Sequence, residues 1–207
     1  MPARDRSSVE EAVAAVRRGE LVVIPTDTVY GLACAPYREE PVRALSELKG
    51  RSPDQPIALV ATSLDRVFEC VPELRGRAGV VARALLPGAL TLVLPNPARR
   101  FPWLTGARPD TIGVRIPDVR GLALELLDAL GVVAATSANR HGGADPRRLE
   151  DLAPDIRSRV AAVIDGGALP GLPSTVVDLT GPEPAVLREG AVPAIEALTR
   201  VEVALGQ

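Results

Sequence analysis

Short apolar runs alternate with amphipathic segments of helical period along the whole chain, and this alternation restricts the fold more than any other feature. Strand-like runs are predicted at 21–24, 57–60, 90–94, 111–116, 132–135, 161–164, 175–179 and 185–188. Several of them are separated by fewer residues than a helical crossover between parallel strands needs. The sequence therefore predicts an α/β fold with a twisted, mixed parallel and antiparallel sheet flanked by helices. At this length, residues 1–207 are expected to form a single domain.

Helices are predicted between these runs, and two stretches are predicted as loops. The helices are expected at 8–18, from Pro41 to 48, at 64–70, 76–85, 122–130 and 147–160, and from Pro193 onward. The segment S-S-V-E at 7–10 is typical of a capping box, and Gly19 is a stop signal for the first helix. The proline-rich segment 95–110 and the glycine-rich segment 165–173 are the predicted loops.

Composition argues against several classes of function. The formal net charge of −2 does not favour binding to a polyanion through overall charge. Aromatic residues make up 2% of the chain, so the stacked-base platforms of single-strand RNA binders lack their usual material. Cys34 and Cys70 have no C-x-x-C spacing and His141 is the only histidine, so no disulfide framework, thiolate zinc site or multi-histidine metal site is predicted.

Targeting segments and common nucleotide-binding motifs are also missing. The N-terminal M-P-A-R-D-R-S-S is followed by no apolar stretch, and no run approaches the roughly 18 apolar residues of a spanning helix. We therefore expect a cytoplasmic protein with no membrane segment. Neither G-x-x-x-x-G-K-[ST] nor G-x-G-x-x-G occurs, so a bound nucleotide would be held in another way than by a P-loop or a Rossmann site.

Three short polar segments follow predicted strands or helices and could carry chemistry. The K-G-R segment at 49–51 places two cations at a helix end, where Arg can hold an oxyanion with two donors and Lys acts as a point charge. S-A-N at 137–139 offers a hydroxyl and an amide, and T-D-T at 26–28 offers two hydroxyls and a carboxylate. A helix C-cap and two turns would explain the same residues, so none of the three decides the function alone. Ligands of open α/β sheets tend to bind beyond the carboxyl ends of strands, where several of these segments are predicted.

Taken together and in order, seven segments resemble the YrdC/TsaC family over nearly the whole chain. They are P-T-D-T-V-Y-G-L at 25–32, K-G-R at 49–51, P-G-A-L-T-L-V-L at 87–94, G-V-R-I-P at 113–117, S-A-N at 137–139, S-T-V-V-D at 174–178 and L-R-E-G at 187–190. The paired K-x-R and S-x-N signatures distinguish this family from other α/β proteins.

The resemblance implies an enzyme that condenses L-threonine, bicarbonate and ATP to threonylcarbamoyl-AMP with release of pyrophosphate, for the t6A modification of tRNA. It also implies a YrdC-like twisted sheet with a concave, basic active-site cleft. Magnesium would accompany the ATP, and a transferase complex of the TsaD/TsaB/TsaE type would take the product. Direct contact with tRNA or double-stranded RNA is left open.

The resemblance also assigns roles to individual residues. Catalytic roles fall on Lys49, Arg51, Ser137 and Asn139. Threonine would be bound by Thr28, Arg115 and Ser174, with Arg115 as the partner of the substrate carboxylate. ATP would be bound by Arg51, Gln55, Thr111, Ser137 and Arg188. No metal ligand is expected among the protein side chains.

Two departures from the family pattern and two alternative functions accompany this interpretation. Ser52 stands where the family often has proline, and Val60 stands where some members have a histidine near threonine, which bears on threonine affinity. One alternative is a paralogue with the carbamoyl-adenylate chemistry of hydrogenase maturation. The other is a non-catalytic protein that binds double-stranded RNA.

Overall fold

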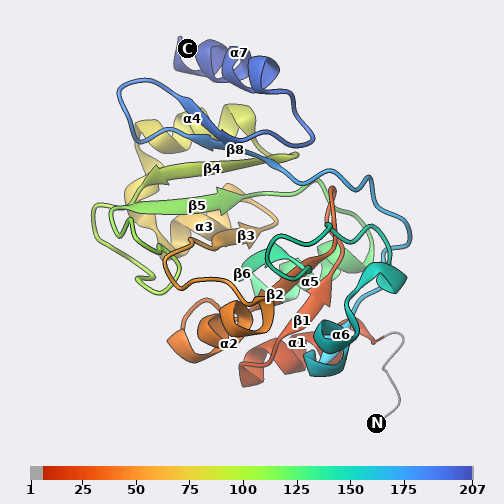
Figure 1. Ribbon diagram of the computed structural model, residues 1–207. Helices are drawn as coiled ribbons and strands as arrows, with labels where there is room; N and C mark the ends of the chain where they lie inside the picture. The colour runs from red at the N-terminus through yellow and green to blue at the C-terminus, as the bar shows by residue number, and fades with distance from the viewer. Residues whose placement is uncertain (1–6, 207) are drawn as a thin grey trace.

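A nine-stranded sheet forms the centre of the protein in the computed structural model, which describes residues 7–206 (Figure 1). Its strands are β1 (Val22–Ile24), β2 (Gly31–Cys34), β3 (Ala58–Ala61), β4 (Leu90–Pro95), β5 (Thr111–Arg115), β6 (Val132–Ser137), β7 (Ala162–Val163), β8 (Thr175–Asp178) and β9 (Ala185–Arg188). They are arranged in the order β7-β1-β2-β6-β3-β5-β4-β8-β9. The pairs β1/β7, β3/β5 and β4/β8 are parallel, and the other neighbours are antiparallel. The predicted mixed sheet is therefore confirmed.

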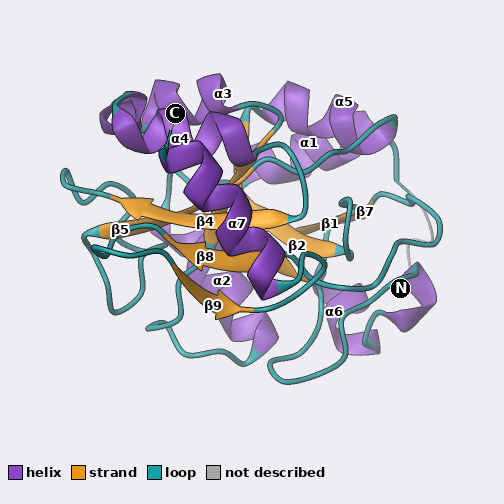
Figure 2. Ribbon diagram, turned by 90° about the horizontal axis from the view of Figure 1, so that it is seen from above, coloured by secondary structure: helices purple, strands orange, loops and turns teal. Residues whose placement is uncertain are grey.

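Helices pack on both faces of this sheet (Figure 2). They are α1 (Val9–Arg18), α2 (Glu39–Lys49), α3 (Leu64–Cys70), α4 (Arg77–Leu85), α5 (Leu122–Leu130), α6 (Pro154–Arg159) and α7 (Ala194–Leu205), with 3-10 turns at Pro72–Arg75 and Leu149–Asp151. One apolar cluster contains buried residues of α1 and α5, whereas a larger cluster contains buried residues of α2, α3, α4, α6 and α7. Because neighbouring residues of a strand point to opposite faces, both faces of the central strands are buried.

Two predicted helix boundaries need correction. The capping box of α1 is formed by Ser8 and Glu11, one residue later than predicted. Ser8 Oγ accepts a hydrogen bond from the Glu11 N–H, and the Ser8 N–H donates to Glu11 Oε2. The helix predicted at 147–160 is instead a 3-10 turn followed by the short α6. Pro154 lacks an N–H and disfavours helical geometry in the residue before it, so one continuous helix cannot form.

Strand β2 is absent from the prediction, and it decides where the polar segments meet. Gly31, the first residue of β2, pairs with Ser137, the last residue of β6, so the T-D-T and S-A-N segments become neighbours. Ser174 lies just before β8, whereas Arg115 is the last residue of β5. T-D-T follows the end of β1, S-A-N begins at the end of β6 and Arg115 ends β5, as expected for strand carboxyl ends, whereas Ser174 precedes the first residue of its strand.

The described residues bear on two further expectations from the sequence. Both cysteines are free, with Cys34 buried and Cys70 half-buried. Among residues 7–206, no helix is long and apolar enough to cross a membrane. The first six residues, on which the prediction about the N-terminus partly rests, lie outside the described residues.

Gly190→Ala should destabilise the protein by about 1–3 kcal/mol, the usual cost of overpacking. A Cβ at Gly190 would lie 2.1 Å from the Pro173 carbonyl oxygen, and the Gly190 N–H donates to Thr175 Oγ1 at 2.9 Å. The added methyl group must therefore push β9 away from the start of β8. We expect thermal unfolding several degrees below that of the unmodified protein.

Gly181→Ala is the matched control for this measurement. A Cβ at Gly181 would come no closer than 3.4 Å to its nearest neighbour, the Glu183 carbonyl oxygen. Its unfolding temperature should be unchanged. Equal unfolding temperatures for the two variants would contradict the tight approach of β9 to β8.

Candidate active site

Lys49 ties the end of α2 to the loop that follows β6. Its Nζ donates to Asn139 O at 2.7 Å, to Asn139 Oδ1 at 2.8 Å and to the carbonyl oxygen of Ser137. The Lys49 carbonyl oxygen accepts the His141 N–H at 2.9 Å. Gly50 ends the helix in the left-handed conformation, at φ 66°, and thereby turns the chain toward Arg51.

The side chains of Ser137 and Asn139 are bonded to each other and to their own loop. Ser137 Oγ donates to Asn139 Oδ1 at 2.7 Å, and Asn139 Nδ2 donates to Gly143 O at 2.6 Å. Lys49 therefore joins the K-G-R segment to the S-A-N segment in one connected network, although Lys49 and Ser137 are 88 residues apart. This arrangement brings together the four residues predicted to be catalytic.

Arg51 borders this network through Thr136, the residue before Ser137, and is half-buried. Its Nε donates to Gln55 Oε1 at 3.1 Å, its Nη1 to Thr136 Oγ1 at 3.2 Å and its Nη2 to Pro56 O at 2.9 Å. Since a guanidinium has five N–H groups, two of them remain available to an anion. Gln55 is thus placed as a neighbour of Arg51, in agreement with their assignment to one subsite.

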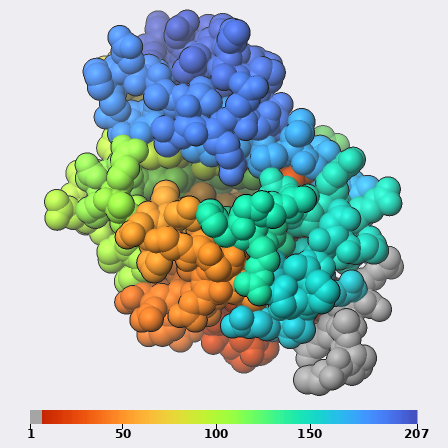
Figure 3. Space-filling view, in the orientation of Figure 1, coloured from red at the N-terminus to blue at the C-terminus, as the bar shows by residue number. Residues whose placement is uncertain are grey.

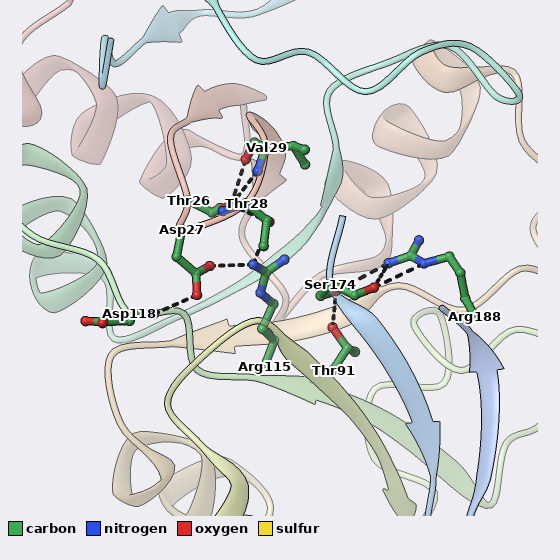
Figure 4. Close-up of polar contacts among 9 residues, drawn as sticks. All are labelled: Thr26, Asp27, Thr28, Val29, Thr91, Arg115, Asp118, Ser174 and Arg188. Carbon is green, nitrogen blue, oxygen red and sulfur yellow. Dashed lines mark hydrogen bonds and ion pairs between the residues drawn. The ribbon is translucent and has the colours of Figure 1, made fainter. Parts of the chain in front are cut away.

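Arg115 forms a buried ion pair with Asp27 (Figure 4). Its Nη2 donates to Asp27 Oδ1 at 2.5 Å and to Thr28 Oγ1 at 2.7 Å, while Asp27 Oδ2 accepts the Asp118 N–H at 3.0 Å. Among the described residues, Arg115 Nε is buried without a hydrogen-bond partner. A buried donor of a cation without an acceptor is costly, so this guanidinium is suited to an incoming carboxylate.

Ser174 lies between Thr91 and Arg188 in the same view (Figure 4). Its Oγ is 2.7 Å from Thr91 Oγ1, and its carbonyl oxygen accepts from Arg188 Nη2 at 2.7 Å. A second bond from Arg188 Nη2 reaches Ser174 Oγ at 3.3 Å. Ser174 therefore connects the arginine predicted for ATP with the pocket predicted for threonine.

Four cations influence one another across this region. Burial and, to a smaller extent, the charge of Arg51 lower the pKa of Lys49 to about 8, against the opposing effect of Asp145. Burial and the charge of Arg188 lower the pKa of Arg51. Burial also lowers the pKa of Arg115, opposed by Asp27, and that of Arg188, opposed by Asp145. Among residues 7–206, Asp27 and Asp145 are the carboxylates that oppose these four charges, so the cluster is cationic.

Three further residues named from the sequence are Thr111, Val60 and Ser52. Thr111 is buried at the start of β5, four residues before Arg115, and its Oγ1 donates to Arg108 O at 3.0 Å. Its contact with ATP stays a prediction. Val60 is buried and pairs with Arg115 across the parallel strands β3 and β5, which places it beside the arginine. Ser52 is exposed and bonds to Asp54 at 3.2 Å.

The sequence prediction missed three residues that hold the predicted ones in place: Asp27, Thr91 and Thr136. Asp27 was named only as the carboxylate of the T-D-T segment, and its pairing with Arg115 was not predicted. The turn interpretation is right for Thr26, whose hydroxyl bonds to Val29 O at 2.7 Å. The composition also singles out Lys49, because it is the only lysine of the chain and every other basic residue except His141 is an arginine.

The surface is recessed between the C-terminal segment, shown in blue, and the orange and teal parts of the chain (Figure 3). A separate hollow of about 330 Å³ lies between α4 and α7 and is lined by residues such as Val81, Leu179 and Leu205. None of its lining residues belongs to the cationic cluster. The polar network, rather than this hollow, is therefore the candidate active site.

Comparison with known proteins identifies relatives over nearly the whole chain. The family model Sua5_yciO_yrdC, described as "Telomere recombination", matches residues 14–190. The threonylcarbamoyl-AMP synthase of Pyrococcus abyssi is 35% identical over 209 residues, which cover 98% of this chain and 60% of that protein. This chain therefore spans less than two thirds of that relative's length.

Solved structures agree with this match. The crystal structure of P. abyssi Sua5 complexed with L-threonine has a TM-score of 0.82 and 35% identity, covering 96% of this chain and 57% of that one. The crystal structure of Escherichia coli YciO has a TM-score of 0.78 and 28% identity, covering 92% of both chains. The fold expected from the resemblance is confirmed, and the protein belongs to the Sua5/YciO/YrdC family.

Proposed function

We propose that this protein is a threonylcarbamoyl-AMP synthase, which condenses L-threonine, bicarbonate and ATP and releases pyrophosphate. The observation that carries the proposal is the convergence of Lys49, Arg51, Arg115 and Arg188 in one partly buried cluster. All three substrates are anionic or carry a carboxylate, so a concentrated positive charge favours their assembly. The relatives named threonylcarbamoyl-AMP synthase give further support.

In this proposal the cluster has two ends. The end formed by Arg51, Gln55, Ser137, Asn139 and Arg188 would hold the triphosphate, with the charge of Lys49 beside it, and Thr111 would contact ATP beyond it. The other end, formed by Thr28, Arg115 and Ser174, would hold threonine. Support for this division comes from the unpartnered Nε of Arg115, which is suited to a carboxylate. The bonds from Arg188 to Ser174 would keep the two substrates adjacent.

The chemistry requires no nucleophile from the protein. The amine of threonine combines with bicarbonate to form a carbamate with loss of water, and a carbamate oxygen then attacks the α-phosphorus of ATP. The bond from the α-phosphorus to the bridging oxygen breaks, and pyrophosphate leaves with the electron pair. Negative charge develops on both sides of the phosphorus, so fixed cations can lower the barrier by positioning and charge stabilisation.

Magnesium, partners and location follow from the proposed reaction. Mg²⁺ would be bound mainly by the ATP phosphates, since no group of three His, Cys, Asp or Glu side chains among residues 7–206 could hold a metal. When bound, it would neutralise phosphate charge. We further propose that a single YrdC-like domain over residues 1–207 works in the cytoplasm and passes its product to a TsaD/TsaB/TsaE-type complex for tRNA modification. The continuity of the sheet supports the single domain.

Pyrophosphate release from ATP by the purified protein tests the proposal directly. With bicarbonate present, release should depend on L-threonine and should be much slower with L-serine or with no amino acid. Removal of bicarbonate should abolish the threonine-dependent rate. Equal background release under all of these conditions would contradict the proposal and favour carbamoyl-adenylate chemistry or RNA binding instead.

ATP affinity should fall about tenfold between pH 7 and pH 9 in the absence of threonine. The pKa of Lys49 is lowered to about 8, so its charged form is lost as the pH rises through that value and makes up about a tenth of the molecules at pH 9. The arginines keep their charge throughout this range. Calorimetric titration with a non-hydrolysable ATP analogue measures the effect.

Lys49→Met is the control for this pH dependence. The variant has no group at position 49 that titrates, so its weaker affinity should not change between pH 7 and pH 9. A constant affinity of the unmodified protein over the same range would contradict the assigned role of the Lys49 charge.

A further inference from the structure

We propose that Lys49 is a positioning residue, which holds the 137–143 loop in the shape that binds the nucleotide phosphates and does not bind phosphate itself. The inference rests on the proposed function only for the identity of the ligand. It concerns how one residue of the site acts, and its evidence lies in the bonds of Lys49.

All three N–H groups of the Lys49 ammonium already have acceptors. They point to Ser137 O, Asn139 O and Asn139 Oδ1, and every one of these acceptors belongs to the 137–143 loop. An ammonium has three donors and no more, so a phosphate oxygen could bind only if one of these bonds were broken. Lys49 is also only 4% exposed, which leaves little surface for a ligand.

The loop depends on Lys49 at more than one point. Besides the three bonds to Nζ, the His141 N–H donates to the Lys49 carbonyl oxygen at 2.9 Å. Asn139 Oδ1 accepts both from Lys49 and from Ser137 Oγ, so the side chains of the S-A-N segment are oriented through the ammonium. Loss of the ammonium would therefore release the carbonyl oxygens of Ser137 and Asn139 and leave the Asn139 side chain without its charged partner.

Arg51 provides the contrast within the same segment. Its acceptors are Gln55, Thr136 and Pro56, none of which lies in the 137–143 loop, and two of its N–H groups remain free of these bonds. Arg51 is thus equipped to touch a phosphate, whereas Lys49 is equipped to hold the loop.

The choice of lysine supports the same conclusion. Lys49 is the only lysine in a chain whose other basic side chains, apart from His141, are all arginines. A guanidinium donates in one plane, whereas an ammonium directs three donors toward a compact set of acceptors. Three acceptors around one buried nitrogen atom therefore favour lysine over arginine. If the residue at position 49 only bound a phosphate, an arginine would serve at least as well.

The first experiment observes the Lys49 ammonium by nitrogen-15 NMR, free and with a non-hydrolysable ATP analogue. Because the chain has one lysine, the Nζ signal needs no assignment. We expect a slowly exchanging signal in the free protein that persists with the analogue and shows no coupling to phosphorus-31. A signal that appears only with the analogue, or that couples to phosphorus, would overturn the proposal.

The second experiment compares hydrogen exchange of the loop in Lys49→Met and Arg51→Met, both without nucleotide. The Ala138, His141 and Gly143 amides donate to Tyr30 O, Lys49 O and Arg140 O, and they report on the loop. We expect at least tenfold faster exchange of these amides in Lys49→Met and unchanged exchange in Arg51→Met. Unchanged exchange in both variants would contradict a positioning role.

The two experiments separate this inference from the proposed function. Hydrogen exchange is measured without nucleotide, so it tests the loop even if the protein proves not to use ATP. Absence of binding between the unmodified protein and the ATP analogue would count against the proposed function alone. If Lys49→Met does not fold, the NMR measurement on the unmodified protein still decides the inference.

Discussion

Replacing Arg51 by alanine should lower kcat/KM for ATP by about 100- to 1,000-fold while the protein remains folded. Arg51 is the cation of the K-G-R segment with N–H groups left for a phosphate, and Arg188 adds a second positive charge close enough to lower the pKa of Arg51. Removal of one preorganised donor at a reacting centre typically costs about 2.7–4 kcal/mol of transition-state stabilisation. Threonine-dependent pyrophosphate release over a range of ATP concentrations provides the measurement.

Two further variants make this prediction specific. Arg51→Lys keeps the charge but cannot bond to Gln55, Thr136 and Pro56 at once, so it should recover only part of the loss. Arg43→Ala removes an exposed arginine of α2 outside the cluster and should leave kcat/KM unchanged. Similar rates for Arg43→Ala and Arg51→Ala would contradict the assignment of Arg51 to the phosphate subsite.

Most strands and helices could be predicted because their apolar residues recur with a clear period. The helix at Leu122–Leu130 matches its predicted bounds, and the loops at 95–110 and 165–173 are confirmed. Strand β2 was missed because all four of its residues are buried, so it shows neither alternation nor a polar boundary. The prediction of one helix at 147–160 is wrong because Pro154 interrupts it, although apolar residues recur along this segment.

The contacts of the site could not be predicted from spacing along the chain. Lys49 and Asn139 are 90 residues apart, and they meet only because β2 and β6 pair in the register that sets Gly31 opposite Ser137. The sequence motifs identified which side chains matter, yet they did not reveal which of them bond to one another. For the same reason the partner of Arg115 was missed, although Asp27 lies within a quoted motif.

The two ends of the cationic cluster differ in how their charge is balanced. At the threonine end, Arg115 is paired with a carboxylate that is itself fixed by the Asp118 N–H. At the end proposed for the phosphates, Asp145 opposes the lowering of the pKa of Lys49 and of Arg188, whereas the charge of Arg188 further lowers the pKa of Arg51. A triphosphate carries more charge than an amino acid carboxylate, so the less neutralised end is suited to ATP.

Replacing Arg115 by glutamine should lower kcat/KM for threonine by about 100-fold or more and change the KM for ATP little. In the proposed function the guanidinium would bind the substrate carboxylate, and its Nε has no partner among the described residues. L-threoninamide, which lacks the carboxylate charge, should be a poor substrate for both proteins, and the variant should lose little further activity with it. An equally large loss with the amide would contradict carboxylate recognition by Arg115.

The double variant Asp27→Asn, Arg115→Gln separates binding from stability. In the single variant the Asp27 carboxylate stays buried without its cation, and breaking a buried pair in this way costs about 3–5 kcal/mol of unfolding free energy. Removing both charges should restore most of that free energy, because no uncompensated charge remains buried. Threonine recognition should stay lost, because the substrate carboxylate still has no cation. Thermal unfolding of the single and the double variant measures the stability, and threonine kinetics of the same two proteins measure recognition. Recovery of threonine activity in the double variant would show that Arg115 acts only through stability.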